Sequence, residues 1–257
     1  MPDTGTGTDA GTDAGTGART GTGTDDTRAR AQVEALLAER GETYAEEAGI
    51  RLKDTPQPLY ELLVLTHLLS ARIRASTAVA AARALFAAGM STPRRMHDAT
   101  WQQRVDALGE GGYRRYDEST ATQLGSEAEL VLAEYGGDLR RMRAAADGDP
   151  DALREALRAS PGIGPAGADI FLREVQGVWP EYAPVLDGRA LDGARKLGLP
   201  TDPRALAALV PQDRLPALAA ALVRTALDHR RTATAAGSAR RPGDAAAPTV
   251  RTPRAAA

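Results

Sequence analysis

Residues 149–197 read DPDALREALRASPGIGPAGADIFLREVQGVWPEYAPVLDGRALDGARKL and carry the most informative pattern of the chain. Apolar residues recur at helical spacing on both sides of a Gly-Ile-Gly turn: Leu153, Ala156 and Leu157 before it, and Ala168, Phe171, Leu172 and Val175 after it. Pro161 ends the first helix, and the glycines Gly162 and Gly164 permit backbone conformations that other residues avoid. The pattern predicts two short helices joined by a tight hairpin, with Ile163 tucked between them.

Such a hairpin can be an ordinary corner between two helices, or it can be a binding element. The backbone amides that begin the second helix would face outward together with the positive end of the helix dipole. A DNA phosphate is an anion that suits this position. From the residues alone, both interpretations of Gly162, Ile163 and Gly164 stay open.

The wider pattern resembles the helix-hairpin-helix motif of DNA-binding proteins. Its residues are Leu157, Pro161, Gly162, Ile163, Gly164, Ala168 and the pair Ile170–Phe171. A stretch containing Gly and Pro follows, and it leads to Val185-Leu186-Asp187-Gly188. Asp187 lies 25 residues beyond Gly162. Together these features resemble the helix-hairpin-helix GPD superfamily of DNA glycosylases, the endonuclease III-like proteins.

The resemblance extends to residues 58–71 (PLYELLVLTHLLSA), which are similar to the early buried helix of endonuclease III, and to residues 112–132, which are similar to its long middle helix. It covers about residues 30–229 and implies an all-α fold with two lobes. A helical barrel of about residues 50–175 would face a second lobe, built from residues 28–49 and 176–229. Duplex DNA would lie against the groove between the lobes.

In this family the Asp after the hairpin is the catalytic carboxylate, and Asp187 occupies that place. Breaking an N-glycosidic bond builds positive charge on the deoxyribose, which a fixed carboxylate can stabilise while it orients a water molecule. A second interpretation makes Asp187 the N-cap of a helix that starts near Arg189. The two roles are compatible.

Three positions depart from the family pattern. Ala166 stands where a glycosylase with lyase activity has its nucleophilic Lys, so the resemblance implies a monofunctional glycosylase that uses water. Thr66 stands where the adenine-specific branch has a catalytic Glu, which leaves the excised base unidentified. Arg72 aligns with a Gln that fills the gap left by the flipped base, and its planar head can stack and donate hydrogen bonds. Arg72 can equally be a plain cation at a helix end.

Other residues have a structural and a functional interpretation side by side. Arg189 follows Asp187 and would contact a DNA phosphate, or it would belong to the solvated face of a short helix. His67 lies in an apolar helix, where a hydrogen-bonded core His is more common than a catalytic one. Trp179 is expected in the core beside the hairpin.

Composition excludes several classes of function. The chain of 257 residues has no Cys, so it cannot form the four-cysteine iron–sulfur cluster usual in the family, and we expect neither a cofactor nor a metal site. The 32 basic and 34 acidic residues leave a net charge of −2. No apolar run reaches the roughly 18 residues of a membrane helix, and no signal sequence is evident. We therefore expect a soluble intracellular protein. The resemblance to DNA glycosylases further implies a cytoplasmic, nucleoid-associated monomer.

The two ends of the chain differ from the middle. Residues 1–27 are rich in Gly, Thr and Asp, and residues 230–257 are rich in Arg, Ala and Pro. Residues 1–27 have no large apolar residue after Met1 and cannot offset their ordering entropy, so they are predicted to be disordered. Residues 230–257 are likewise predicted to be a disordered tail. Residues 28–229 show helical periodicity throughout, including 59–69, 76–88 and 215–226. We expect roughly ten helices there.

Three functions fit the sequence. The first is a base-excision repair DNA glycosylase that flips a damaged or mismatched base out of duplex DNA and hydrolyses its glycosidic bond. The second is a catalytically inactive relative that binds DNA, which the residues at 66 and 166 favour. The third is a helical protein whose hairpin binds another protein. Asp187 in its motif favours the first.

Overall fold

The computed structural model describes the backbone of residues 20–238 and the side chains of residues 25–228, and its regular structure there is entirely helical. The expected all-α fold is therefore confirmed. The elements in chain order are α1 (Thr20–Arg40), α2 (Tyr44–Glu47), α3 (Pro56–Ser70), α4 (Ala75–Ala87), α5 (Pro93–Asp98), α6 (Trp101–Glu110), α7 (Asp117–Tyr135), α8 (Leu139–Ala146), α9 (Pro150–Arg158), α10 (Pro165–Val175), η1 (Pro180–Tyr182), α11 (Gly188–Lys196), α12 (Pro203–Ala207), η2 (Gln212–Arg214) and α13 (Leu215–Ser238).

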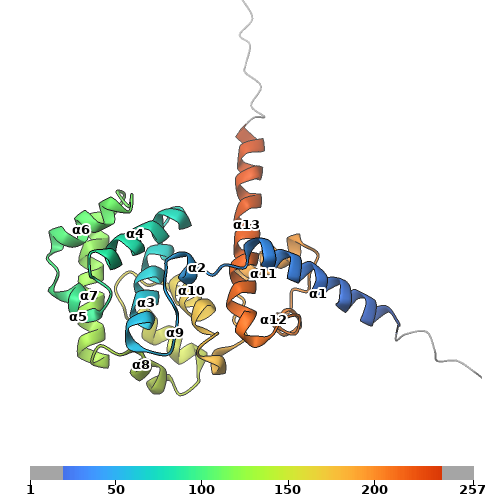
Figure 1. Cartoon of the computed structure of the whole chain (residues 1–257), viewed down its shortest axis with the longest axis horizontal. Helices are drawn as coiled ribbons and strands as arrows, with labels where there is room; N and C mark the ends of the chain where they lie inside the picture. The colour runs from blue at the N-terminus through green and yellow to red at the C-terminus, as the bar shows by residue number, and fades with distance from the viewer. Residues whose placement is uncertain (1–19, 239–257) are drawn as a thin grey trace, which may run out of the picture.

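The helices form two groups, which Figure 1 shows side by side. In the first group α3 packs against α4 and α10, and α7 packs against α5 and α6. In the second group α13 is the central helix, with α11 and α1 packed along it. The short helix α2 connects the groups in sequence, and α10 also contacts α13. The hairpin formed by α9 and α10 therefore belongs to the first group and borders the second.

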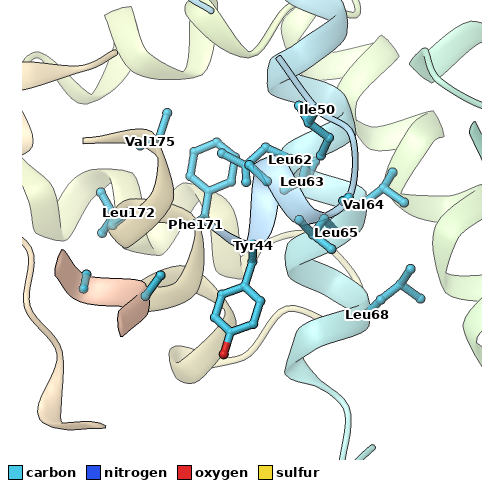
Figure 2. Close-up of a cluster of buried hydrophobic side chains, with 14 of the residues drawn as sticks. Tyr44, Ile50, Leu62, Leu63, Val64, Leu65, Leu68, Phe171, Leu172 and Val175 are labelled. Carbon is cyan, nitrogen blue, oxygen red and sulfur yellow. The ribbon is translucent and has the colours of Figure 1, made fainter. Parts of the chain in front are cut away.

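The core of the first group surrounds α3. Nine of its fifteen residues are buried, as expected for the nearly continuous apolar run 59–69. Pro at the start of α3 occupies a position where a helix has no amide hydrogen bond to lose. Figure 2 shows Phe171 of α10 lying against Leu62 and Leu63 of α3. Trp179 is fully buried beside Phe171, with ring centroids 5.7 Å apart, so its predicted core position is confirmed.

Helices α1 and α13 extend into both segments that the sequence analysis assigns to tails. Helix α1 begins at Thr20 and α13 ends at Ser238, so residues 20–27 and 230–238 are helical. At the first end, an ion pair between Asp26 and Arg30, one helical turn apart, supports the helix, and Ala29 packs against the core. At the second end, the sequence RRTATAAGS contains three Ala and two Arg, which favour a helix, beside Thr, Gly and Ser, which do not. The rest of both predicted tails lies outside the described residues.

No described helix is both long enough and apolar enough to cross a membrane.

The second group depends on a close contact between α11 and α13. A Cβ atom added at Gly193 would lie 2.0 Å from the carbonyl oxygen of Leu222. Because this neighbour is backbone, it cannot move aside without shifting a whole helix. The sequence thus places Gly where the two helices approach each other most closely.

Replacing Gly193 by Ala is expected to lower the free energy of unfolding by about 1–3 kcal/mol, the usual cost of overpacking. Gly109 in α6 is the matched control, since an added Cβ there meets nothing within 4 Å. Gly109→Ala is expected to raise stability by about 0.5–1 kcal/mol, since Ala favours the helix. Urea denaturation measures both. Equal stability of the two variants would contradict the packing account.

Candidate functional site

The hairpin has the geometry that the sequence predicts. Helices α9 and α10 are joined by a turn in which Gly162 has φ +86°, a conformation that favours glycine. Ile163 is buried between the helices, and its amide donates to the carbonyl oxygen of Ser160 at 3.1 Å. Gly164 is the N-cap of α10 and supplies no side chain to the first amides of that helix. Pro165, the first residue of α10, has no N–H, so the amides available to an external acceptor are those of Ala166 and Gly167.

Gly162 lies directly on a buried histidine. A Cβ atom at this position would come within 2.4 Å of His67 Cε1 and 2.9 Å of Gln123 Oε1. Gly164 is different, because an added Cβ meets nothing within 4 Å. The first glycine is thus required by the fold, whereas the second leaves an open backbone face.

His67 is a hydrogen-bonded core residue, as the simpler interpretation predicted. It is 3 % exposed, with Nδ1 lying 3.0 Å from Glu127 Oε2 and Nε2 lying 3.2 Å from Gln123 Oε1. Sequence reasoning missed Glu127, which is fully buried within α7 and 60 positions away in the chain. An acidic residue at an inward position of α7 was the available signal. The pair holds α3 and α7 together beneath the hairpin.

Asp187 occupies the N-cap of α11, so its structural interpretation is correct. Its Oδ1 accepts a hydrogen bond from the Ala190 amide at 2.9 Å. The preceding segment is held against the end of α10 by Gln176, whose Nε2 donates to the Arg173 and Val185 carbonyl oxygens. The same side chain accepts from the Val185 amide through Oε1 at 2.8 Å. Gln176 therefore fixes the position from which Asp187 projects.

The second oxygen of Asp187 forms an ion pair that the sequence analysis did not predict. Arg173 Nη1 lies 2.5 Å from Asp187 Oδ2, and the two side chains are 3 % and 12 % exposed. Arg173 Nε is buried and has no hydrogen-bond partner. Position 173 sits between the inward residues Leu172 and Val175 of α10, and a cation on that face was the signal that could have revealed it.

The residue next to Arg173 faces another part of the boundary between the groups. Glu174 is 1 % exposed, and its Oε2 accepts from the Ala45 amide at 3.0 Å. Burial raises the pKa of Glu174, while Arg173 and the backbone amides at Tyr44 and Ala45 oppose the rise. These contacts join α10 to the start of α2.

A cleft of about 440 Å³ lies where the two groups meet. It brings together four of the residues predicted from the sequence, namely Arg72, Ala166, Asp187 and Arg189. Its other lining residues are Tyr44, Leu69, Ser70, Ala71, Ile73, Ala75, Asp169, Ile170, Arg173, Gly188, Val223 and Leu227. We call this hollow the interlobe cleft. Gly162, Ile163 and Gly164 do not line it, although Ala166 at the start of α10 does.

The cleft carries unbalanced positive charge. Arg72 and Arg189 are exposed, and neither has a hydrogen bond or ion pair with any described residue. The two carboxylates in the cleft are already paired, Asp187 with Arg173 and Asp169 with Arg154, whose Nε lies 3.0 Å from Asp169 Oδ1. Burial raises the pKa of Tyr44, so this phenol is neutral at pH 7. The arrangement attracts an anion.

Arg72 also lines a second hollow of about 420 Å³, which shares Ser70 and Ala71 with the interlobe cleft. His67, Gln123 and Gly162 lie in the wall of this hollow, together with Tyr113, Tyr116, Ser119 and Thr120. Gly162 of the hairpin and Arg72 of the interlobe cleft therefore line the same second hollow, next to the end of α3.

Neither Lys of the chain lines the interlobe cleft. Lys53 is exposed, and Lys196 donates from Nζ to the Ala226 carbonyl oxygen at 2.9 Å. Thr66 is fully buried in α3 and does not reach the cleft. Within residues 25–228 no three His, Asp or Glu side chains gather in a metal-binding cluster.

Comparison with known proteins finds a similarity among solved structures. The chain matches no family model, and it matches no curated protein. It is similar to a solved structure described as a trapped endonuclease III–DNA covalent intermediate in an estranged-adenine complex. The sequences are 16 % identical, the match covers 76 % of this chain and 84 % of that chain, and the TM-score is 0.43.

Proposed function

We propose that the protein is a monofunctional DNA N-glycosylase of base-excision repair, acting on duplex DNA that contains a damaged or mismatched base. The observation that carries this proposal is the interlobe cleft, where Asp187 lies together with Arg72, Ala166 and Arg189. These residues come from three different helices or their ends. The proposed enzyme is a cytoplasmic, nucleoid-associated monomer and needs no cofactor.

In this proposal Asp187 stabilises the positive charge that develops on the deoxyribose and orients the attacking water. Its position is fixed by the hydrogen bond from Ala190 and by Gln176 behind it. Arg72 occupies the space that the flipped base leaves. Arg189 holds a phosphate beside the reacting nucleotide.

The hairpin supplies affinity rather than chemistry. Gly164 leaves the start of α10 open, and the amides of Ala166 and Gly167 would donate to phosphate oxygens of one strand. Such contacts are independent of base sequence, so the hairpin would fix the register of the duplex while the cleft selects the base.

A second candidate is a DNA-binding protein without catalysis. The ion pair between Arg173 and Asp187 favours it, because the guanidinium offsets the charge that a glycosylase needs. A screen of duplexes carrying different lesions, with alkali added afterwards, separates the two candidates. Alkali-dependent strand breaks at the lesion support the enzyme. Tight duplex binding without any abasic product would favour the binding protein.

Ala166 leads to an expected result that concerns the product. Because the motif holds no Lys and neither Lys53 nor Lys196 lines the cleft, borohydride should trap no covalent protein–DNA adduct during turnover. Product strands should break only after alkali. Denaturing gel electrophoresis of labelled duplex measures both. An adduct that maps to Lys53, Lys196 or the N-terminal amine would contradict the monofunctional assignment.

A further inference from the structure

The pair formed by Arg173 and Asp187 controls access to the carboxylate. We propose that Arg173 is a charge gate. It holds Asp187 Oδ2 in the DNA-free protein and transfers to a phosphate group that enters the interlobe cleft, which releases the carboxylate for reaction. This inference rests on the proposed glycosylase function and adds a positioning residue and a phosphate site to it.

The state of Arg173 is the first support. Its side chain is 3 % exposed, and breaking a pair as buried as this would leave a charge without compensation. A guanidinium has five N–H donors, and the one on Nε has no partner although it is buried. A phosphate is an acceptor that matches the planar donor edge of Arg. Arg173 therefore has a free N–H donor for the phosphate that would replace Asp187.

The charge around the pair is the second support. Arg72 and Arg189 line the same cleft without a partner among the described residues, while Arg173 and Asp187 neutralise each other. The groups free to attract a ligand are therefore both cationic. They would draw a phosphate into the cleft and raise its local concentration beside Arg173.

The two oxygens of Asp187 have different partners, so Oδ2 can leave Arg173 while Oδ1 keeps the side chain in place. Oδ1 stays bound to the Ala190 amide at the N-terminus of α11, which favours a negative charge. When a phosphate takes over Arg173, Oδ2 becomes free while the side chain keeps its place. The charge of the carboxylate is then no longer offset by Arg173, and this happens only after the nucleic acid has bound.

A titration with inorganic phosphate at constant ionic strength tests the gate, with melting temperature and calorimetry as readouts. Wild type is expected to bind phosphate saturably. Arg173→Gln should weaken that binding by about tenfold or more, the loss of a charge-assisted hydrogen bond, and Arg173→Lys should restore part of it. Asp187→Asn should tighten it by about tenfold, because the competitor for Arg173 is gone.

Asp169→Asn is the matched control. It removes the same charge from the same cleft, but Asp169 pairs with Arg154 and not with Arg173. Its effect on phosphate affinity should stay below about threefold, since only long-range attraction changes. If Asp187→Asn binds phosphate no better than wild type or than Asp169→Asn, the pair is structural and the gate is wrong.

A measurement on wild type covers the case in which a variant does not fold. The Nε–H resonance of Arg173 should move during the phosphate titration with the same dissociation constant as calorimetry gives. An unmoved resonance would overturn the gate. These readouts need no glycosylase activity, so phosphate binding with the expected variant pattern but without base excision would reject the proposed function and keep only the phosphate site and the exchange of Arg173 between Asp187 and phosphate.

Discussion

Replacing Asp187 by Asn is expected to lower the single-turnover rate of glycosidic-bond cleavage by about 10²–10³-fold, the usual effect of losing one preorganised electrostatic group. Asn keeps an oxygen that can accept from the Ala190 amide, so the start of α11 retains its cap. It removes the charge that opposes the developing sugar cation. Duplex affinity should survive or increase, because a carboxylate near phosphates is repulsive before reaction.

The substitution also affects stability, so a control is needed. Asp187→Asn leaves Arg173 without its anion, and removing one partner of a buried pair typically costs roughly 3–5 kcal/mol. Arg173→Gln breaks the same pair from the other side and leaves the carboxylate in place. At saturating enzyme its rate should stay within about tenfold of wild type, because the reacting charge remains.

Rates are to be measured below the melting temperature of each variant, with the folded fraction checked by circular dichroism. Undiminished cleavage by Asp187→Asn would remove the catalytic role of this carboxylate. If Arg173→Gln loses as much activity as Asp187→Asn, the ion pair as a whole is the important feature, and the charge of Asp187 is not.

Local periodicity was sufficient to predict the helices that carry the core. The apolar run 59–69 and the two sides of the Gly-Ile-Gly turn became α3, α9 and α10, because burial of a continuous apolar face dominates at those positions. The periodic segment 76–88 likewise became α4. These segments need no knowledge of distant residues.

Contacts between distant residues were not predictable in the same way. Arg173 meets Asp187 across a loop, and His67 meets Glu127 from another helix, so no spacing rule links either pair. The ends of α1 and α13 were missed for a different reason. Those ends lack the apolar periodicity from which the other helices are predicted, and the Thr, Gly and Asp residues at 20–27 have low helix propensity.

The hairpin glycines provide the second large expected effect, because the structure assigns them different roles. Gly162→Ala forces a side chain into φ +86° and against His67 at 2.4 Å. The left-handed conformation alone costs roughly 1–2 kcal/mol, and the collision adds to it. We expect the free energy of unfolding to fall by about 2 kcal/mol or more, together with a broad loss of duplex affinity that depends little on base sequence.

Gly164→Ala separates binding from folding. Its backbone is extended and an added Cβ meets nothing within 4 Å, so stability should change by less than about 0.5 kcal/mol. If a phosphate approaches the amides of α10 at this point, the new methyl group stands in its path and duplex affinity should still fall. Urea denaturation and fluorescence anisotropy with labelled duplex measure the two effects. A Gly164→Ala variant of wild-type stability and wild-type affinity would exclude the hairpin from the DNA interface, since the only change would then lie on a face that DNA does not touch.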